Sequence, residues 1–156
     1  YGPIPCEFHD PEAMRGKDKF FAADRATRVW RYPHNWMHCV LPANVKPAKP
    51  ADVPIMVGDD FTKAPRPANI EFKVICSEVT DDNELSLTLN RAPLPDLSQP
   101  DTWQRQNLSS CNLWESATAF AIQLKPDQLK LGRNNVGISV GEGEVIARAA
   151  EVRVSY

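Results

Sequence analysis

Apolar and polar side chains alternate residue by residue in several short stretches of this chain. A period of two residues places every second side chain on the same face of a β-strand. The pattern therefore predicts strands that bury one face, and it disfavours long helices. The apolar positions are Ile70, Phe72, Val74 and Cys76; Leu85, Leu87 and Leu89; Phe120, Ile122 and Leu124; Val136, Ile138 and Val140; and Ala150, Val152, Val154 and Tyr156.

Proline and turn-forming residues separate these stretches. The chain has 14 prolines in 156 residues, a share well above the usual level of roughly 5%. Gly58-Asp59-Asp60, Asp81-Asp82-Asn83 and Gly141-Glu142-Gly143 predict turns, since glycine and Asp or Asn favour tight backbone reversals. We predict an all-β fold, an antiparallel β-sandwich of the jelly-roll kind with about eight strands and little helix.

The stretches 70–77 and 84–90 are expected to pair with each other as antiparallel neighbours, because only the turn at Asp81-Asp82-Asn83 separates them. After them comes a long polar connection, from Arg91 to Glu115, with little periodicity. Connections of that length are usually functional or disordered.

The first half of the chain carries weaker signals. Arg28–Tyr32, Met37–Leu41 and Pro54–Val57 are predicted as short strands, and 43–53 as a lysine- and proline-rich loop. Residues 1–26 are expected to be an irregular N-terminal segment. Within that segment a helical turn is predicted between Glu12 and Ala23, because Asp10 and Pro11 supply the residues that favour a helix start.

A single domain is expected, because 156 residues with 42% hydrophobic content suffice for one core. The chain begins at Tyr1 without a signal-like stretch, so we expect a domain excised from a larger protein. The net charge is −2 and lysine and arginine form no run longer than two, so neither nucleic acid nor a membrane is expected as a partner.

The four cysteines are far apart in the sequence, at Cys6, Cys39, Cys76 and Cys111. Without a C-x-x-C pair they do not resemble a zinc or redox motif, and sequence cannot choose among their three possible pairings. Because Cys76 continues the apolar positions of 70–77, we expect a buried free thiol there. A Cys6–Cys39 bridge remains open.

Three segments resemble galactose-binding-like jelly rolls: 84–94 (ELSLTLNRAPL), 129–140 (LKLGRNNVGISV) and 150–156 (AEVRVSY). Such domains are commonly appended to bacterial glycoside hydrolases, often as C-terminal accessory domains, and many act as carbohydrate-binding modules. The family often has glycine after the asparagine of the first segment, where this chain has Arg91. Because Arg91 lacks the backbone freedom of glycine, this position favours the tight two-residue turn of the family less strongly.

Sugar recognition needs an aromatic face for the C–H side of a pyranose and planar groups that hydrogen-bond its hydroxyls. The long connection brings such residues together, and 30–36 forms a second aromatic cluster. The alternatives are that the tryptophans close the open end of the sandwich and that 30–36 lies in the core or at a domain interface. The candidate carbohydrate-binding residues are Trp103, Gln104, Arg105, Asn107, Asn112, Trp114 and Trp36.

No enzyme is expected, because the sequence contains no H-E-x-x-H and no phosphate-binding glycine loop. The paired carboxylates Asp59-Asp60 and Asp81-Asp82 lie in predicted turns, where aspartate is a turn former. The resemblance also implies a possible structural calcium ion. Those four aspartates are the candidate ligands, because calcium prefers oxygen donors; no cofactor is required.

The sequence thus predicts a non-catalytic carbohydrate-binding module attached to a polysaccharide-degrading enzyme. Its partners would be a glycan or polysaccharide and the neighbouring catalytic domain. Its location would be secreted, periplasmic or at the cell surface. The alternative is a structural β-sandwich accessory domain that packs on a parent hydrolase and binds no small ligand.

Overall fold

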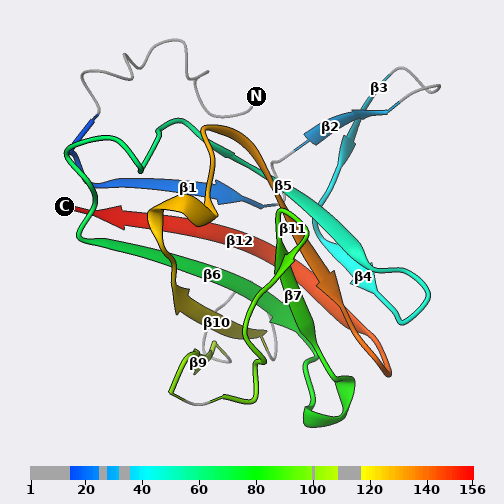
Figure 1. Ribbon diagram of the computed structural model, residues 1–156. Coiled ribbons are helices and arrows are strands. Elements are labelled where there is room, and N and C mark those ends of the chain that lie inside the picture. The colour runs from blue at the N-terminus through cyan, green and yellow to red at the C-terminus, as the bar shows by residue number, and fades with distance from the viewer. Residues whose placement is uncertain (1–14, 25–27, 32–35, 100, 109–116) are drawn as a thin grey trace.

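The computed structural model describes residues 15–24, 28–31, 36–99, 101–108 and 117–156, and it forms a sandwich of two antiparallel β-sheets (Figure 1). The predicted all-β fold class and antiparallel sandwich are confirmed. The two sheets contain six and four strands, where about eight were predicted. None of the described residues belongs to a helix that is long and apolar enough to cross a membrane.

The larger sheet has the order β1-β12-β6-β10-β9, and β4 also pairs with β12. The smaller sheet has the order β5-β11-β7-β8. A separate hairpin is formed by β2 and β3, which pair with each other. The bounds are β1 Lys19–Ala23, β2 Arg28–Arg31, β3 Trp36–Cys39, β4 Ala43–Val45, β5 Ala51–Val57, β6 Asn69–Ser77, β7 Ser86–Leu89, β8 Ala92–Pro93, β9 Gln104–Asn107, β10 Ala117–Gln123, β11 Gly132–Ser139 and β12 Val145–Ser155. Short 3₁₀ turns cover Asp81–Asn83 and Pro126–Gln128.

The core lies between the sheets and is built from the alternating apolar positions. Phe72 and Val74 of β6, Phe120 of β10 and Val152 of β12 are buried from the larger sheet, and Val136 of β11 is buried from the smaller one. Each fully buried side chain of this size contributes roughly 1.5–3 kcal/mol. The period-two pattern therefore identified the inward faces correctly.

The cysteines are described in part. Cys76 belongs to the core as a free, buried thiol, as expected. Cys6 and Cys111 lie outside the described residues, so a Cys6–Cys39 bridge stays a prediction.

The predicted pairing of 70–77 with 84–90 is wrong. β6 pairs with β10 and β12 in the larger sheet, whereas β7 pairs with β11 and β8 in the smaller one. The 3₁₀ turn Asp81–Asn83 lies where the chain passes from one sheet to the other. Alternation tells which side of a strand is buried, but it carries no information about which neighbour supplies the hydrogen bonds.

Two expectations for the first half are also corrected. Lys19–Ala23, placed in an irregular segment with a helical turn, is strand β1, because β12 supplies hydrogen-bonding partners from Ala150 to Val154. The loop predicted at 43–53 contains β4 and the start of β5, which pair with β12 and β11. Residues 1–14 lie outside the described part of the chain.

The turn between β7 and β8 is a two-residue turn despite the missing glycine. Leu89 pairs with Ala92, and the two residues between them, Asn90 and Arg91, have φ values of 52° and 69°. Both lie in the left-handed region that two-residue hairpin turns of type I′ require. Asn90 is secured by tertiary hydrogen bonds, since its backbone N–H donates to Asn135 O at 2.8 Å.

Candidate functional site

Trp103, one of the two tryptophans predicted in the long connection, lies in the core. Its side chain is 3% exposed, and its indole Nε1–H donates to the carbonyl oxygen of Pro95 at 2.9 Å. The indole therefore offers no exposed face on which a sugar could stack, and the expectation of a Trp103 platform is corrected. Its burial, together with the hydrogen bond to Pro95, fixes the chain immediately before β9.

Three other predicted residues, Gln104, Arg105 and Asn107, form β9 together with Gln106. All four are exposed, and β9 is an edge strand of the larger sheet. Every one of them ends in a planar amide or guanidinium group. The backbone strand is held on one side by β10, through the pairs from Asn107–Thr118 to Gln104–Ala121.

The side chains of β9 divide between the two faces of the sheet. Gln104 and Gln106 are opposite Ala121 and Ala119, which lie on the face turned away from the smaller sheet. Arg105 is opposite Phe120, whose ring belongs to the core. Because neighbouring residues of a strand point to opposite faces, the four groups cannot converge on one point. They form a polar rim along the edge.

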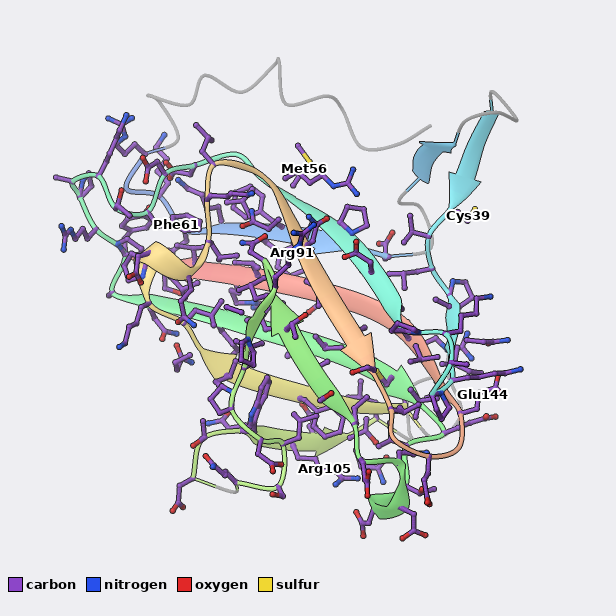
Figure 2. All side chains as sticks on the ribbon, turned by 45° about the vertical axis from the view of Figure 1, so that its right-hand side comes forward. Cys39, Met56, Phe61, Arg91, Arg105 and Glu144 are labelled. Atoms are coloured by element: carbon purple, nitrogen blue, oxygen red, sulfur yellow. The ribbon has the colours of Figure 1, made fainter. Side chains whose placement is uncertain are left out.

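Arg105 is held in place by two contacts. Its guanidinium lies 5.3 Å from the centroid of the Phe120 ring, and its Nη1 lies 3.5 Å from the carboxylate of Asp81. The first contact is a cation–π interaction at the edge of the core. Figure 2 shows Arg105 at the β9 edge of the sandwich. The Phe120 contact is the main restriction on its position, because the ion pair with Asp81 is exposed to solvent and therefore weak.

On the outer face of the larger sheet, β10 has buried alanines next to β9, and β6 has the buried Ile75 opposite Ala119 and charged side chains further along the strand. Ala119 and Ala121 of β10 separate the two glutamines of β9 from β6, where Lys73 Nζ lies 3.7 Å from Glu71. Gln123 is exposed on the same face of β10, opposite Glu71. Sequence reasoning missed Gln123, because it belongs to a different strand from the β9 residues and only the sheet pairing brings the two strands together.

The side-chain contacts described above involve none of the three remaining predicted site residues. Asn112 and Trp114 lie outside the described residues. The backbone of Trp36 is in β3, where it pairs with Arg31 of β2. These three assignments stay predictions.

The four candidate metal ligands do not form one site. Asp59 and Asp60 follow β5 and precede β6, whereas Asp81 and Asp82 follow the end of β6, so the length of that strand separates the two pairs. Among the described residues, no group of three or more His, Cys, Asp or Glu side chains is placed to hold a metal ion. Hydrogen bonds from Thr62, through its hydroxyl and its backbone N–H, lower the pKa of Asp60.

Asp59 has structural partners that sequence reasoning missed. Its carboxylate forms a buried ion pair with Lys19 of β1 and accepts a hydrogen bond from the Tyr156 hydroxyl at 3.4 Å. Burial, reinforced by the negative charge of Asp59, raises the pKa of Tyr156. The cluster connects β1 and the residue that follows β12 to the segment after β5. No sequence signal pairs residues that are 40 and 97 positions apart.

A scan against protein-family models gives no match for this chain, and a search of curated proteins gives none either.

Proposed function

We propose that this domain is a non-catalytic carbohydrate-binding module that acts beside a polysaccharide-degrading enzyme outside the cytoplasm. One observation carries the proposal: β9 presents four consecutive exposed side chains with planar hydrogen-bonding groups. Amides and guanidinium groups match the paired hydroxyls of sugars, because they place their hydrogen-bonding atoms in one plane. The likeness of 84–94 and 129–140 to galactose-binding-like jelly rolls supports the same proposal.

The β9 rim is prepared for binding by its surroundings. Trp103 fixes the strand from one end, and the contacts to Phe120 and Asp81 restrict Arg105. A guanidinium group that is already ordered loses less side-chain freedom when a ligand binds, and each immobilised long side chain otherwise costs about 0.5–1.5 kcal/mol. In this proposal a glycan lies along the edge strand, with Gln104 and Gln106 bonding it from the outer face.

Affinity gel electrophoresis of the isolated domain with a panel of soluble polysaccharides tests the proposal. The domain should be retarded by at least one of them, and the double variant Gln104→Ala/Gln106→Ala should bind about tenfold more weakly, since two hydrogen bonds contribute about 1–3 kcal/mol. Asn44→Ala is the matched control, because Asn44 is an exposed amide on β4, away from β9. If the folded domain is retarded by no polysaccharide, with calcium present, the proposal fails.

A second candidate, an accessory domain that packs on its parent enzyme, is favoured by the β2–β3 hairpin. Among the described strands, these two pair only with each other, and Figure 1 shows the hairpin standing apart from the two sheets. An isolated two-stranded hairpin is marginally stable in water, so a neighbouring surface would stabilise it. Calorimetry separates the candidates: a packed domain unfolds at a higher temperature in the parent protein than alone, whereas an independent module unfolds at the same temperature in both.

A further inference from the structure

An open pocket lies between the β7–β8 turn and the segment that leads into β11. Its volume is about 380 Å³, within the range of about 300–1,000 Å³ that is usual for small-ligand sites. No residue of β9 lines it, so it is separate from the proposed polysaccharide rim. The lining residues are Leu89, Asn90, Ala92, Leu94, Asp127, Gln128, Leu129 and Lys130.

The pocket wall is held by an amide network. Asn90 Nδ2 donates to Asn134 Oδ1 at 2.8 Å, and Asn90 Oδ1 accepts from the backbone N–H of Asn135 at 2.9 Å. Asn134 is fully buried, and its own Nδ2 donates to Lys130 O at 2.8 Å. These bonds join the β7–β8 turn to the segment before β11. The two sides of the pocket are thereby held in position without a ligand.

The chemistry of the lining is both apolar and polar. Leu89 and Leu129 are core residues at 2% and 4% exposure, and Leu94 packs against the core beside them. The exposed side chains of Asp127, Gln128 and Lys130 provide both acceptors and donors. The one carboxylate and the one ammonium group balance, so the lining does not favour a charged ligand of either sign.

We infer that this pocket is a second binding site, which accepts a single neutral sugar ring; the choice of a sugar as the ligand rests on the proposed function. A pyranose has an aliphatic C–H side for the exposed Ala92 and the half-buried Leu94, and it has hydroxyl groups, which both donate and accept, for the polar side chains. A ligand of this size bound in an open pocket is held weakly, with a Kd on the order of 1 mM. The site would therefore recognise the end of a glycan chain, whereas the β9 rim follows its length.

NMR titration of the isotope-labelled domain with methyl glycosides of glucose, galactose, mannose and xylose tests the inference. At least one sugar should give saturable shifts of the Asn90 and Gln128 side-chain amides. Ala92→Leu, which adds volume to the lining, should weaken that binding about tenfold or more, and Ala48→Leu, in the exposed turn between β4 and β5, should leave it unchanged. Gln128→Ala on the polar side of the pocket is a second variant that does not add volume.

The inference is overturned if no sugar gives saturable shifts, if Ala92→Leu and Gln128→Ala both bind as the original chain does, or if galacturonate binds more tightly than the neutral sugars. Its failure is distinguishable from failure of the proposed function. If a polysaccharide still retards the domain but no sugar binds in the pocket, only the pocket inference fails. The Gln104→Ala/Gln106→Ala variant tests the β9 rim alone.

Discussion

The Asp59 cluster and strand β9 use polar side chains in opposite ways. Lys19 and Asp59 are 6% and 5% exposed and are paired with each other, with Tyr156 beside them. The amides of Gln104 and Gln106 are exposed at the sheet edge. A buried ion pair stabilises the fold only while both partners are present, whereas exposed amides contribute little to stability and stay available to a ligand. Stability measurements therefore separate structural polar groups from candidate binding groups.

The largest effect is expected at the boundary between core and β9. Trp103→Ala should lower the free energy of unfolding by about 3–5 kcal/mol, because it leaves a cavity and removes the hydrogen bond to Pro95. Its neighbour Gln104→Ala should change that free energy by less than about 0.5 kcal/mol. Urea unfolding measures both. Equal stability of the two variants would contradict the structural role of Trp103.

Lys19→Met tests the buried ion pair. Asp59 would then be buried without its cation, and the free energy of unfolding should fall by about 3–5 kcal/mol. The double variant Lys19→Met/Asp59→Leu is the control, and it should recover much of the loss, because an apolar pair of similar volume often replaces a buried ion pair without cost. A double variant as unstable as the single one would show that the charge is not what matters. Both are measured by urea unfolding.

The pH dependence of the free energy of unfolding tests the burial of Cys76. Burial raises the pKa of its thiol from 9.0 to about 12. Above pH 9 the unfolded chain loses this proton while the folded chain keeps it, so stability is full below pH 9 and falls by up to about 1.4 kcal/mol per pH unit as the pH rises towards 12. The slope should be smaller in Cys76→Ala. Identical slopes for the two proteins across the range between the two pKa values would contradict the burial of the thiol.

The smallest effect is expected at the exposed β7–β8 turn. Arg91 has a φ of 69°, a conformation that glycine adopts without the strain of a side chain. Arg91→Gly should therefore stabilise the domain by about 0.5–1 kcal/mol, and Arg91→Ala should give no such gain. Thermal unfolding of the three proteins compares them. A destabilised glycine variant would mean that the arginine side chain makes a contact that outweighs the strain.

Sequence alone located most of the strands and identified their buried faces. The apolar positions of 70–77 and 136–140 lie in the core, because a two-residue period requires only local geometry. The Asp81-Asp82-Asn83 turn and the buried thiol of Cys76 were also predictable from neighbouring residues. In the candidate site, Gln104, Arg105 and Asn107 were correctly expected at the surface, since they interrupt any apolar pattern.

Only the tertiary structure decided which distant segments and side chains contact one another. β6 and β7 are in different sheets, Trp103 is in the core, and Asp59 meets Lys19 and Tyr156 across long separations in the chain. The same is true of the pocket, whose two sides meet through Asn90 and Asn134. The physical reason is that alternation and turn chemistry act over a few residues. Strand pairing and burial depend on which distant segments can satisfy each other's hydrogen bonds and exclude water together.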